Sequence, residues 1–205
     1  MNEKITLSGV PETMLQTLYA RAKETCTRGA IRDEKAAALV ERIDYDFSLA
    51  DKDAAMHSGV IARTIVLDRL VEGFLAQHQS VAVEERDAPA LVIIEGLTMY
   101  LSERDVQRIF EVIAARFPRV TVLVETMSPA VVRRFKEKSI EGSGARFTWG
   151  VADGAALARL LPGFRLVEEH SLCEGMAAFV PVYRLLDRIP LVRNISNRIV
   201  VLERA

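Results

Sequence analysis

The sequence is poor in the residues that usually form metal sites and disulfides. It has 2 cysteines, Cys26 and Cys173, which lie far apart with no CxxC spacing. This pattern is typical of a reduced, cytoplasmic protein rather than a secreted disulfide scaffold. The 3 histidines are scattered without HxxxH or HExxH spacing. The sequence therefore predicts no metal site.

Long apolar runs and strong net charge are also missing. No apolar run approaches the roughly 18 residues of a membrane-spanning helix, and Met1–Leu7 lacks the basic flank and apolar core of a signal peptide. The net charge is −1 and the isoelectric point is about 6.3. We therefore expect neither a nucleic-acid partner nor a membrane partner.

Three common catalytic signatures are absent as well. The chain contains no GxSxG elbow, no P-loop, and no glycine-rich turn after a first strand. The pattern of residues alone therefore predicts a ligand-binding domain without specifying its reaction.

What is present favours one globular domain over residues 1–205. Half of the 205 residues are hydrophobic and 27% are charged, which is the composition of a folded protein with a substantial core. Helical patterns dominate residues 1–79, and strands alternate with helices over residues 80–205. We expect a helical N-terminal part followed by an α/β part of the same domain.

In the N-terminal part, helix boundaries are marked by specific residues. Pro11 suits the first turn of a helix that Gly29 ends, and Asp33 is placed to cap a second helix. Residues 44–48 are predicted to be a loop. The longest helical pattern covers residues 58–77.

The α/β part is organised around the stretch from Ala90 to Leu101. Its first five residues form an uncharged apolar run, typical of a strand buried on both faces. Ser102 and Asp105 then have the spacing of a helix capping box. Further strands are predicted near 120–124, 164–168 and 198–202, with the 91–95 and 120–124 strands parallel and central, and residues 180–195 are predicted to be mainly loop.

Two residues stand out as candidates for a site, each with an ordinary alternative. Glu95 follows the first strand, at the edge of an open α/β sheet where ligands gather, but it also suits a solvated turn. Arg63 lies inside the longest helix, where an arginine is commonly solvated or salt-bridged. The basic run around Arg133 and Arg134 is most simply a solvated face.

Several blocks of the sequence, in order, resemble one family. They are Ser8-Gly-Val-Pro-Glu-Thr, Leu18-Tyr-Ala-Arg-Ala, Ile43-Asp-Tyr-Asp-Phe-Ser48, Arg63-Thr64, Ile94-Glu-Gly-Leu-Thr-Met-Tyr-Leu101 and Phe147-Thr-Trp-Gly150. The chain is similar to the leucine carboxyl methyltransferase family, in its bacterial branch of polyketide O-methyltransferases. The resemblance implies a shortened Rossmann-like sheet with an N-terminal helical segment.

The resemblance also implies a function and a set of site residues. Members transfer a methyl group from S-adenosylmethionine to a carboxylate or hydroxyl oxygen, here of a small-molecule acceptor. Arg63 and Thr64 match the pair that holds the methionine carboxylate, and Glu95 with Gly96 matches the part of the cofactor pocket after the strand. Tyr100 matches the tyrosine near the acceptor, which makes it the candidate catalytic residue.

The chain departs from the family between residues 79 and 89. Relatives have there a first strand, a Gly-x-Gly-x-Asp-x-Arg loop and further strands, on the order of 70 to 80 residues in all. The resemblance therefore predicts weak cofactor binding, and the alternative function is that of an inactive, self-associating relative.

The same departure predicts an open sheet edge. Without the first strand, one side of Leu91–Ile94 lacks its partner, and an apolar edge favours pairing with another chain. We expect either that Val81–Val83 folds back as a substitute strand, with Glu84–Asp87 as its turn, or that the protein forms a homo-oligomer. Self-association is the expectation we favour.

Overall fold

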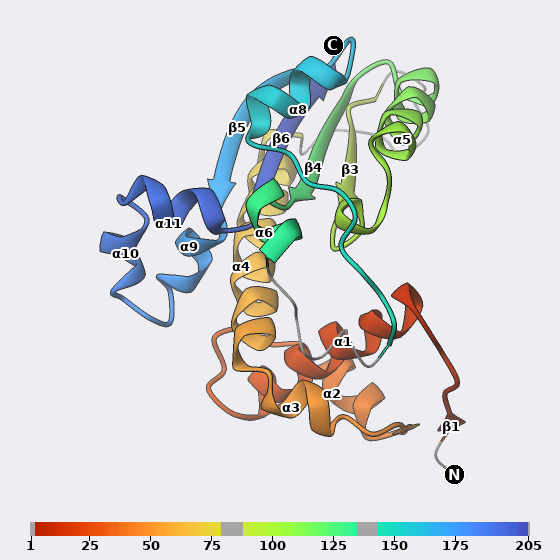
Figure 1. Ribbon diagram of the computed structural model, residues 1–205, viewed down its shortest axis with the longest axis vertical. Coiled ribbons are helices and arrows are strands. Elements are labelled where there is room, and N and C mark those ends of the chain that lie inside the picture. Colours follow the sequence, from red (N-terminus) through yellow and green to blue (C-terminus); the bar gives the residue numbers. More distant parts are fainter. Residues whose placement is uncertain (1–2, 79–87, 135–142, 205) are drawn as a thin grey trace.

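The computed structural model describes residues 3–78, 88–134 and 143–204. A four-stranded sheet carries helices on both faces, and a group of helices from the N-terminus packs below it (Figure 1). The expected α/β class is thereby confirmed. Val81–Val83 and Glu84–Asp87, the expected substitute strand and turn, lie outside the described residues.

The sheet is mixed, and its strand order differs from the expectation. Its strands are β3 (Ala90–Ile94), β4 (Val120–Thr126), β5 (Arg165–Ser171) and β6 (Arg198–Arg204). Their order is β3-β4-β6-β5, with β3 parallel to β4 and β6 antiparallel to both of its neighbours. The parallel pair and the antiparallel last strand are confirmed. The prediction that both parallel strands are central was wrong, because β6 and β5 both lie on the β4 side and β3 is the outermost of the described strands.

Among the described residues, helices cover both faces of the sheet. On one face lie α5 (Glu103–Arg116) and α8 (Gly154–Leu160), which pack on Val122, Val124 and Val200. The other face is covered by α4 (Ala54–Gln77) and α9 (Leu172–Met176), which contact Leu123 and Ile199. Alternate residues of β4 point to opposite faces, so its unbroken apolar run fills both cores.

Helix α4 connects the sheet to the N-terminal helices (Figure 1). Its second half packs on the sheet, while Met56, Val60 and Ile61 in its first half join a separate core with the N-terminal helices. Those helices are α1 (Val10–Cys26), α2 (Glu34–Val40) and α3 (Ser48–Lys52). A two-residue parallel bridge joins β1 (Glu3–Lys4) to β2 (Ile43–Asp44). Because α4 belongs to both cores, it sets the position of the N-terminal helices on the sheet.

Most predicted helix starts are confirmed by their caps. The Asp33 carboxylate accepts from the Ala36 N–H at 2.9 Å, and Ser102 and Asp105 form the reciprocal capping box. Asp53, which was not predicted as a cap, starts α4 four residues earlier than expected.

Two predicted loops contain short helices. Residues 44–48 include the start of α3, and residues 180–195 contain α10 (Tyr183–Leu186) and α11 (Pro190–Ile195). These helices are 4 to 6 residues long, which is too short for a 3.6-residue apolar period to be recognised. The remaining short elements are η1 (Thr98–Tyr100) and α6 (Pro129–Arg134).

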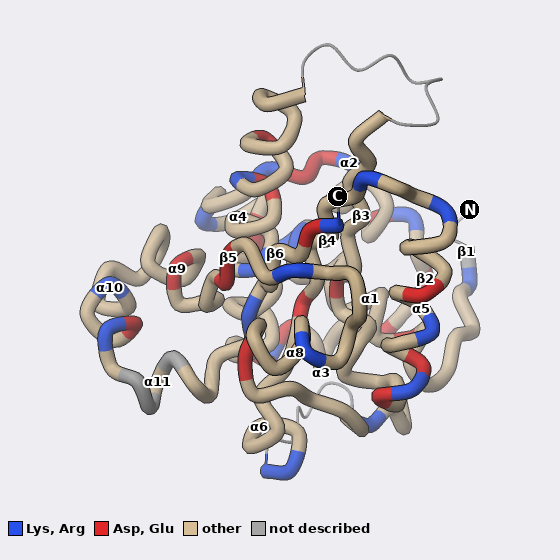
Figure 2. The backbone as a smooth tube through the Cα atoms, turned by 90° about the horizontal axis from the view of Figure 1, so that it is seen from above, with Lys and Arg blue, Asp and Glu red and all other residues tan. Residues whose placement is uncertain are grey.

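The charges are mixed along the chain. Figure 2 shows Lys and Arg interspersed with Asp and Glu over the tube, in keeping with the net charge of −1. Among the described residues, no helix has the length and apolarity needed to cross a bilayer.

Candidate active site

Arg63 stands at the centre of a buried group of charges. Its side chain, on α4, is 11% exposed, and its Nη1 donates to Glu125 Oε2 at 2.9 Å. Its Nε lies 2.7 Å from Glu95 Oε1, in an ion pair. Arg63 is therefore salt-bridged rather than solvated, and the carboxylates that it meets are at the carboxyl ends of β3 and β4.

Glu125 was not predicted, although it makes the most contacts in this group. It is 1% exposed at the carboxyl end of β4. Its Oε2 accepts from Arg63 and from the Gly96 N–H at 2.9 Å, and its Oε1 accepts from Asn197 Nδ2 at 3.1 Å. Glu125 therefore fastens together α4, the loop after β3 and the segment before β6.

The backbone conformation of Gly96 favours glycine. Its φ is +62°, a left-handed conformation that residues with a side chain rarely adopt. Space is not the reason, because a Cβ at this position would lie 3.7 Å from Arg63 Nη1, an ordinary van der Waals contact. The turn thereby brings the Gly96 N–H to Glu125 and places Glu95 beside Arg63.

The electrostatics of the group favour a charged ligand. Burial opposes the charge of Arg63, but the neighbouring Glu125 and Glu95 outweigh it and raise the pKa of Arg63. One guanidinium between two carboxylates leaves a formal charge of −1 in the group. Glu125 is bonded to Nη1 of Arg63, and the ion pair with Glu95 is made at Nε. The group therefore suits a zwitterion, with a carboxylate at Nη2 and an ammonium at the acids.

A small pocket opens beside Arg63. Its volume is about 100 Å³, and it is lined by α1, α4, Gly96, Tyr100 and Phe147. The Tyr100 and Phe147 ring centroids are 5.5 Å apart, so the second ring holds the first at the pocket wall. Pockets for drug-sized ligands measure roughly 300–1,000 Å³. This pocket has room for one end of such a ligand.

The structure brings together four of the five predicted site residues, Arg63, Glu95, Gly96 and Tyr100. Thr64 lies elsewhere: its hydroxyl donates to the Val60 carbonyl at 3.0 Å and accepts from Arg21 Nη1 at 3.0 Å. The reason is helical geometry, since consecutive residues point about 100° apart. With Arg63 facing Glu125, Thr64 faces α1.

Over residues 3–78, 88–134 and 143–204, no group of three or more His, Cys, Asp or Glu side chains is arranged to hold a metal ion.

Comparison with known proteins gives two relatives, while no family model matches the chain. The tetracenomycin polyketide synthesis O-methyltransferase TcmP of Streptomyces glaucescens is 29% identical over 239 residues, covering 85% of this chain and 87% of that enzyme. The S-adenosyl-L-methionine-dependent methyltransferase dpfgK of Gibberella zeae is 24% identical over 247 residues, covering 80% of this chain and 83% of its own length.

The first match also bears on the missing strands. The match to TcmP spans 239 aligned positions, of which this chain fills about 174, or 85% of its 205 residues. At the other positions, about 65 in all, a residue of TcmP is aligned with a gap in this chain. TcmP is therefore longer than this chain within the matched span, as we expect if this chain has lost strands and their crossovers.

Proposed function

Because this chain is related to the S-adenosylmethionine-dependent methyltransferases, we propose that it transfers a methyl group from S-adenosylmethionine to an oxygen of a small-molecule acceptor, as polyketide O-methyltransferases do. The observation that carries the proposal is the group around Arg63, which suits a zwitterionic amino-acid end. We also propose that the sheet is a shortened Rossmann-like sheet, which retains the strands β3, β4, β5 and β6.

Among the described residues, a binding environment is present only for the amino-acid end of the cofactor. Nη2 of Arg63 would hold the methionine carboxylate, and Glu95 would hold the ammonium. When bound, the cofactor supplies an activated methyl group on a sulfonium. The protein then has to align donor and acceptor, and Tyr100 at the pocket wall is the group that would orient the acceptor oxygen.

We expect binding of S-adenosylmethionine to be weak. A charge-assisted bond contributes roughly 1.5–3 kcal/mol, whereas micromolar affinity requires about 8 kcal/mol. The pocket of about 100 Å³ supports the same expectation. Calorimetric titration of S-adenosylmethionine and its demethylated product should therefore give dissociation constants well above micromolar.

The variant Arg63→Lys tests the site with its charge preserved. Lysine keeps a partner for the buried Glu125 but loses the planar fork, so binding should weaken about tenfold or more. The matched control is Arg69→Lys, because Arg69 is on the same helix and pairs with Glu174 at 2.8 Å outside the pocket. No binding by the wild type at millimolar ligand would reject the proposed function.

A second candidate function, a non-catalytic self-associating protein, is supported by the edge at β3. Among the described residues β3 pairs with β4 alone, and the Ala90 N–H donates at 3.0 Å to the carbonyl of Arg119, the residue just before β4. Backbone groups alternate along a strand, so those of Leu91 and Ile93 point away from β4. Ile93 is also 46% exposed. Two copies related by a two-fold axis could pair their β3 strands antiparallel.

Sedimentation velocity at tens of micromolar protein tests this candidate. We expect a dimer for the wild type and a monomer for Ile93→Lys, because a lysine on an edge strand blocks pairing. Leu39→Lys is the control, since Leu39 is 46% exposed on α2, which belongs to the N-terminal helices and not to the sheet. A soluble wild-type monomer would exclude self-association through β3.

A further inference from the structure

A second, larger cavity adjoins the Arg63 pocket. Its volume is about 600 Å³, and it lies between the first turns of α4, α6, α9 and the segment that includes Tyr183 and Ile195. Gly59, Met127, Leu172 and Asn197 line both hollows. A molecule in the larger cavity would therefore lie next to a ligand held at Arg63.

The lining of this cavity is mainly small and apolar. Ala54 and Ala55 leave space along α4, while Met127, Met176 and Ile195 supply apolar surface. Methionine side chains are flexible and polarizable, so they adapt to irregular apolar ligands.

Arg134 gives the cavity its charge. It is the one charged residue among the described lining residues, and none of them is acidic. No ion pair joins Arg134 to an acidic residue in the described part of the chain. The cavity thus combines an apolar body with a single positive charge.

We propose that this cavity binds the methyl acceptor, and that the acceptor is an apolar small molecule carrying one anionic group. The assignment to the acceptor rests on the proposed function. A cavity of about 600 Å³ lies within the range of small-molecule sites, roughly 300–1,000 Å³. Exposed apolar side chains adjoin the lining residue Tyr183 in the sequence: Val182 and Leu185 are 52% and 63% exposed.

The test uses a fluorescent probe of the same chemical class, 8-anilinonaphthalene-1-sulfonate, which is an apolar aromatic molecule with one anionic group. We expect the wild type to bind one molecule with enhanced fluorescence. Ala55→Trp should weaken binding at least tenfold by filling the cavity. Ala76→Trp is the matched control, because Ala76 is an exposed alanine on the same helix but outside the cavity, and it should bind as the wild type does.

The role of Arg134 is tested with a pair of probes. Arg134→Gln should weaken the sulfonate probe about tenfold, the effect of one charge-assisted bond, and leave the uncharged analogue N-phenyl-1-naphthylamine unchanged. Equal binding of the sulfonate probe by the wild type, Ala55→Trp and Arg134→Gln would overturn the proposal.

The cofactor titration separates this inference from the proposed function. The demethylated cofactor is added at the saturating concentration found by calorimetry. If the probe then stays bound, two adjoining compartments are supported; if the probe is displaced, the cavity belongs to the cofactor and the proposal is overturned. Probe binding that Ala55→Trp abolishes, in a protein that binds no S-adenosylmethionine, would reject the methyltransferase function and leave an apolar-anion site.

Discussion

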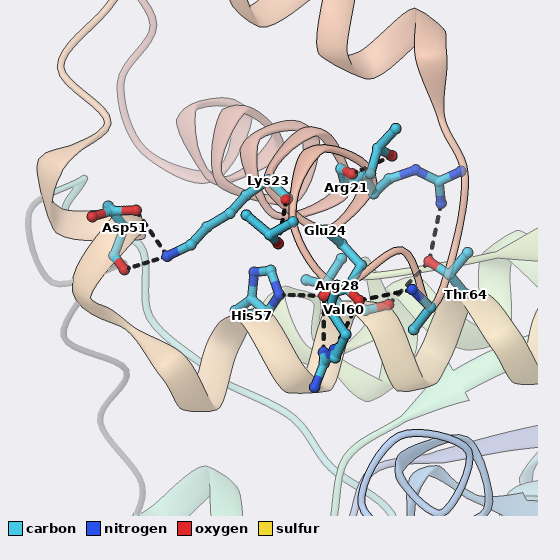
Figure 3. Close-up of polar contacts among 11 residues, drawn as sticks. Arg21, Lys23, Glu24, Arg28, Asp51, His57, Val60 and Thr64 are labelled. Carbon is cyan, nitrogen blue, oxygen red and sulfur yellow. Dashed lines mark hydrogen bonds and ion pairs between the residues drawn. The ribbon is translucent and has the colours of Figure 1, made fainter.

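Replacing Glu24 by glutamine is expected to lower the free energy of unfolding by about 3 kcal/mol at pH 7. Glu24 lies on α1 with a side chain that is 1% exposed. Arg28 donates to both of its oxygens at 2.9 and 2.8 Å, the Ala30 N–H donates at 2.9 Å, and His57 Nε2 lies 2.8 Å away (Figure 3). Glutamine keeps the size of the side chain but cannot carry the charge that these groups surround.

The size of the effect follows from the pKa of Glu24. The hydrogen bonds from Arg28 lower this pKa from 4.5 to about 2, with burial opposing them and the Ala30 N–H and His57 assisting. A depressed carboxyl pKa contributes stability that is present above the ordinary value and is lost as the pH falls through the folded value. A shift of about 2.5 units at about 1.36 kcal/mol each gives roughly 3 kcal/mol.

Urea unfolding between pH 7 and pH 3 measures the effect. The difference between wild type and Glu24→Gln should be full at pH 7 and should shrink below about pH 4.5, as the wild-type carboxyl takes up its proton. Glu34→Gln is the control, because Glu34 pairs with Arg32 at 3.1 Å in a highly exposed ion pair, and it should change stability by less than about 0.5 kcal/mol. A difference that does not vary with pH would show that the charge of Glu24 is not its cause.

Local signals in the sequence predicted the elements that have a cap and an uninterrupted apolar pattern. The helix after Ser102 and the one after Asp33 both begin where their caps predict. These signals work because a cap satisfies backbone N–H groups within a few residues of itself. The position of β6 between β4 and β5 has no such local signal, because pairing joins residues about 75 positions apart, such as Val124 and Val200.

The candidate site shows the same division between local and non-local information. Glu95 was predicted because an acid ends an apolar strand at the edge where ligands gather. Glu125 ends the next apolar strand in the same way, so the same rule would have found it. That both acids meet one arginine 32 and 62 positions earlier in the chain is a consequence of the tertiary packing of α4, which no local pattern specifies.

That packing leads to the second large effect, which is expected for Gly175→Ala. Gly175 lies in α9, buried against α4. A Cβ on Gly175 would lie 2.0 Å from the Ala62 carbonyl oxygen and 2.6 Å from its carbon. The obstacle is backbone, so no side-chain rotation relieves it, and one of the two helices has to move. Overpacking costs typically about 1–3 kcal/mol, and we expect the upper end, about 3 kcal/mol.

Gly73→Ala provides the matched control for this substitution. Gly73 is exposed in α4, and nothing lies within 4 Å of the position of its Cβ, so alanine should raise stability by about 0.5–1 kcal/mol through its helix propensity. Urea unfolding of the two variants should give changes of opposite sign. Because Ala62 directly precedes Arg63, a displaced α4 should also weaken ligand binding at Arg63 in Gly175→Ala and not in Gly73→Ala. A Gly175→Ala protein as stable as the wild type would show that α9 does not approach α4 this closely.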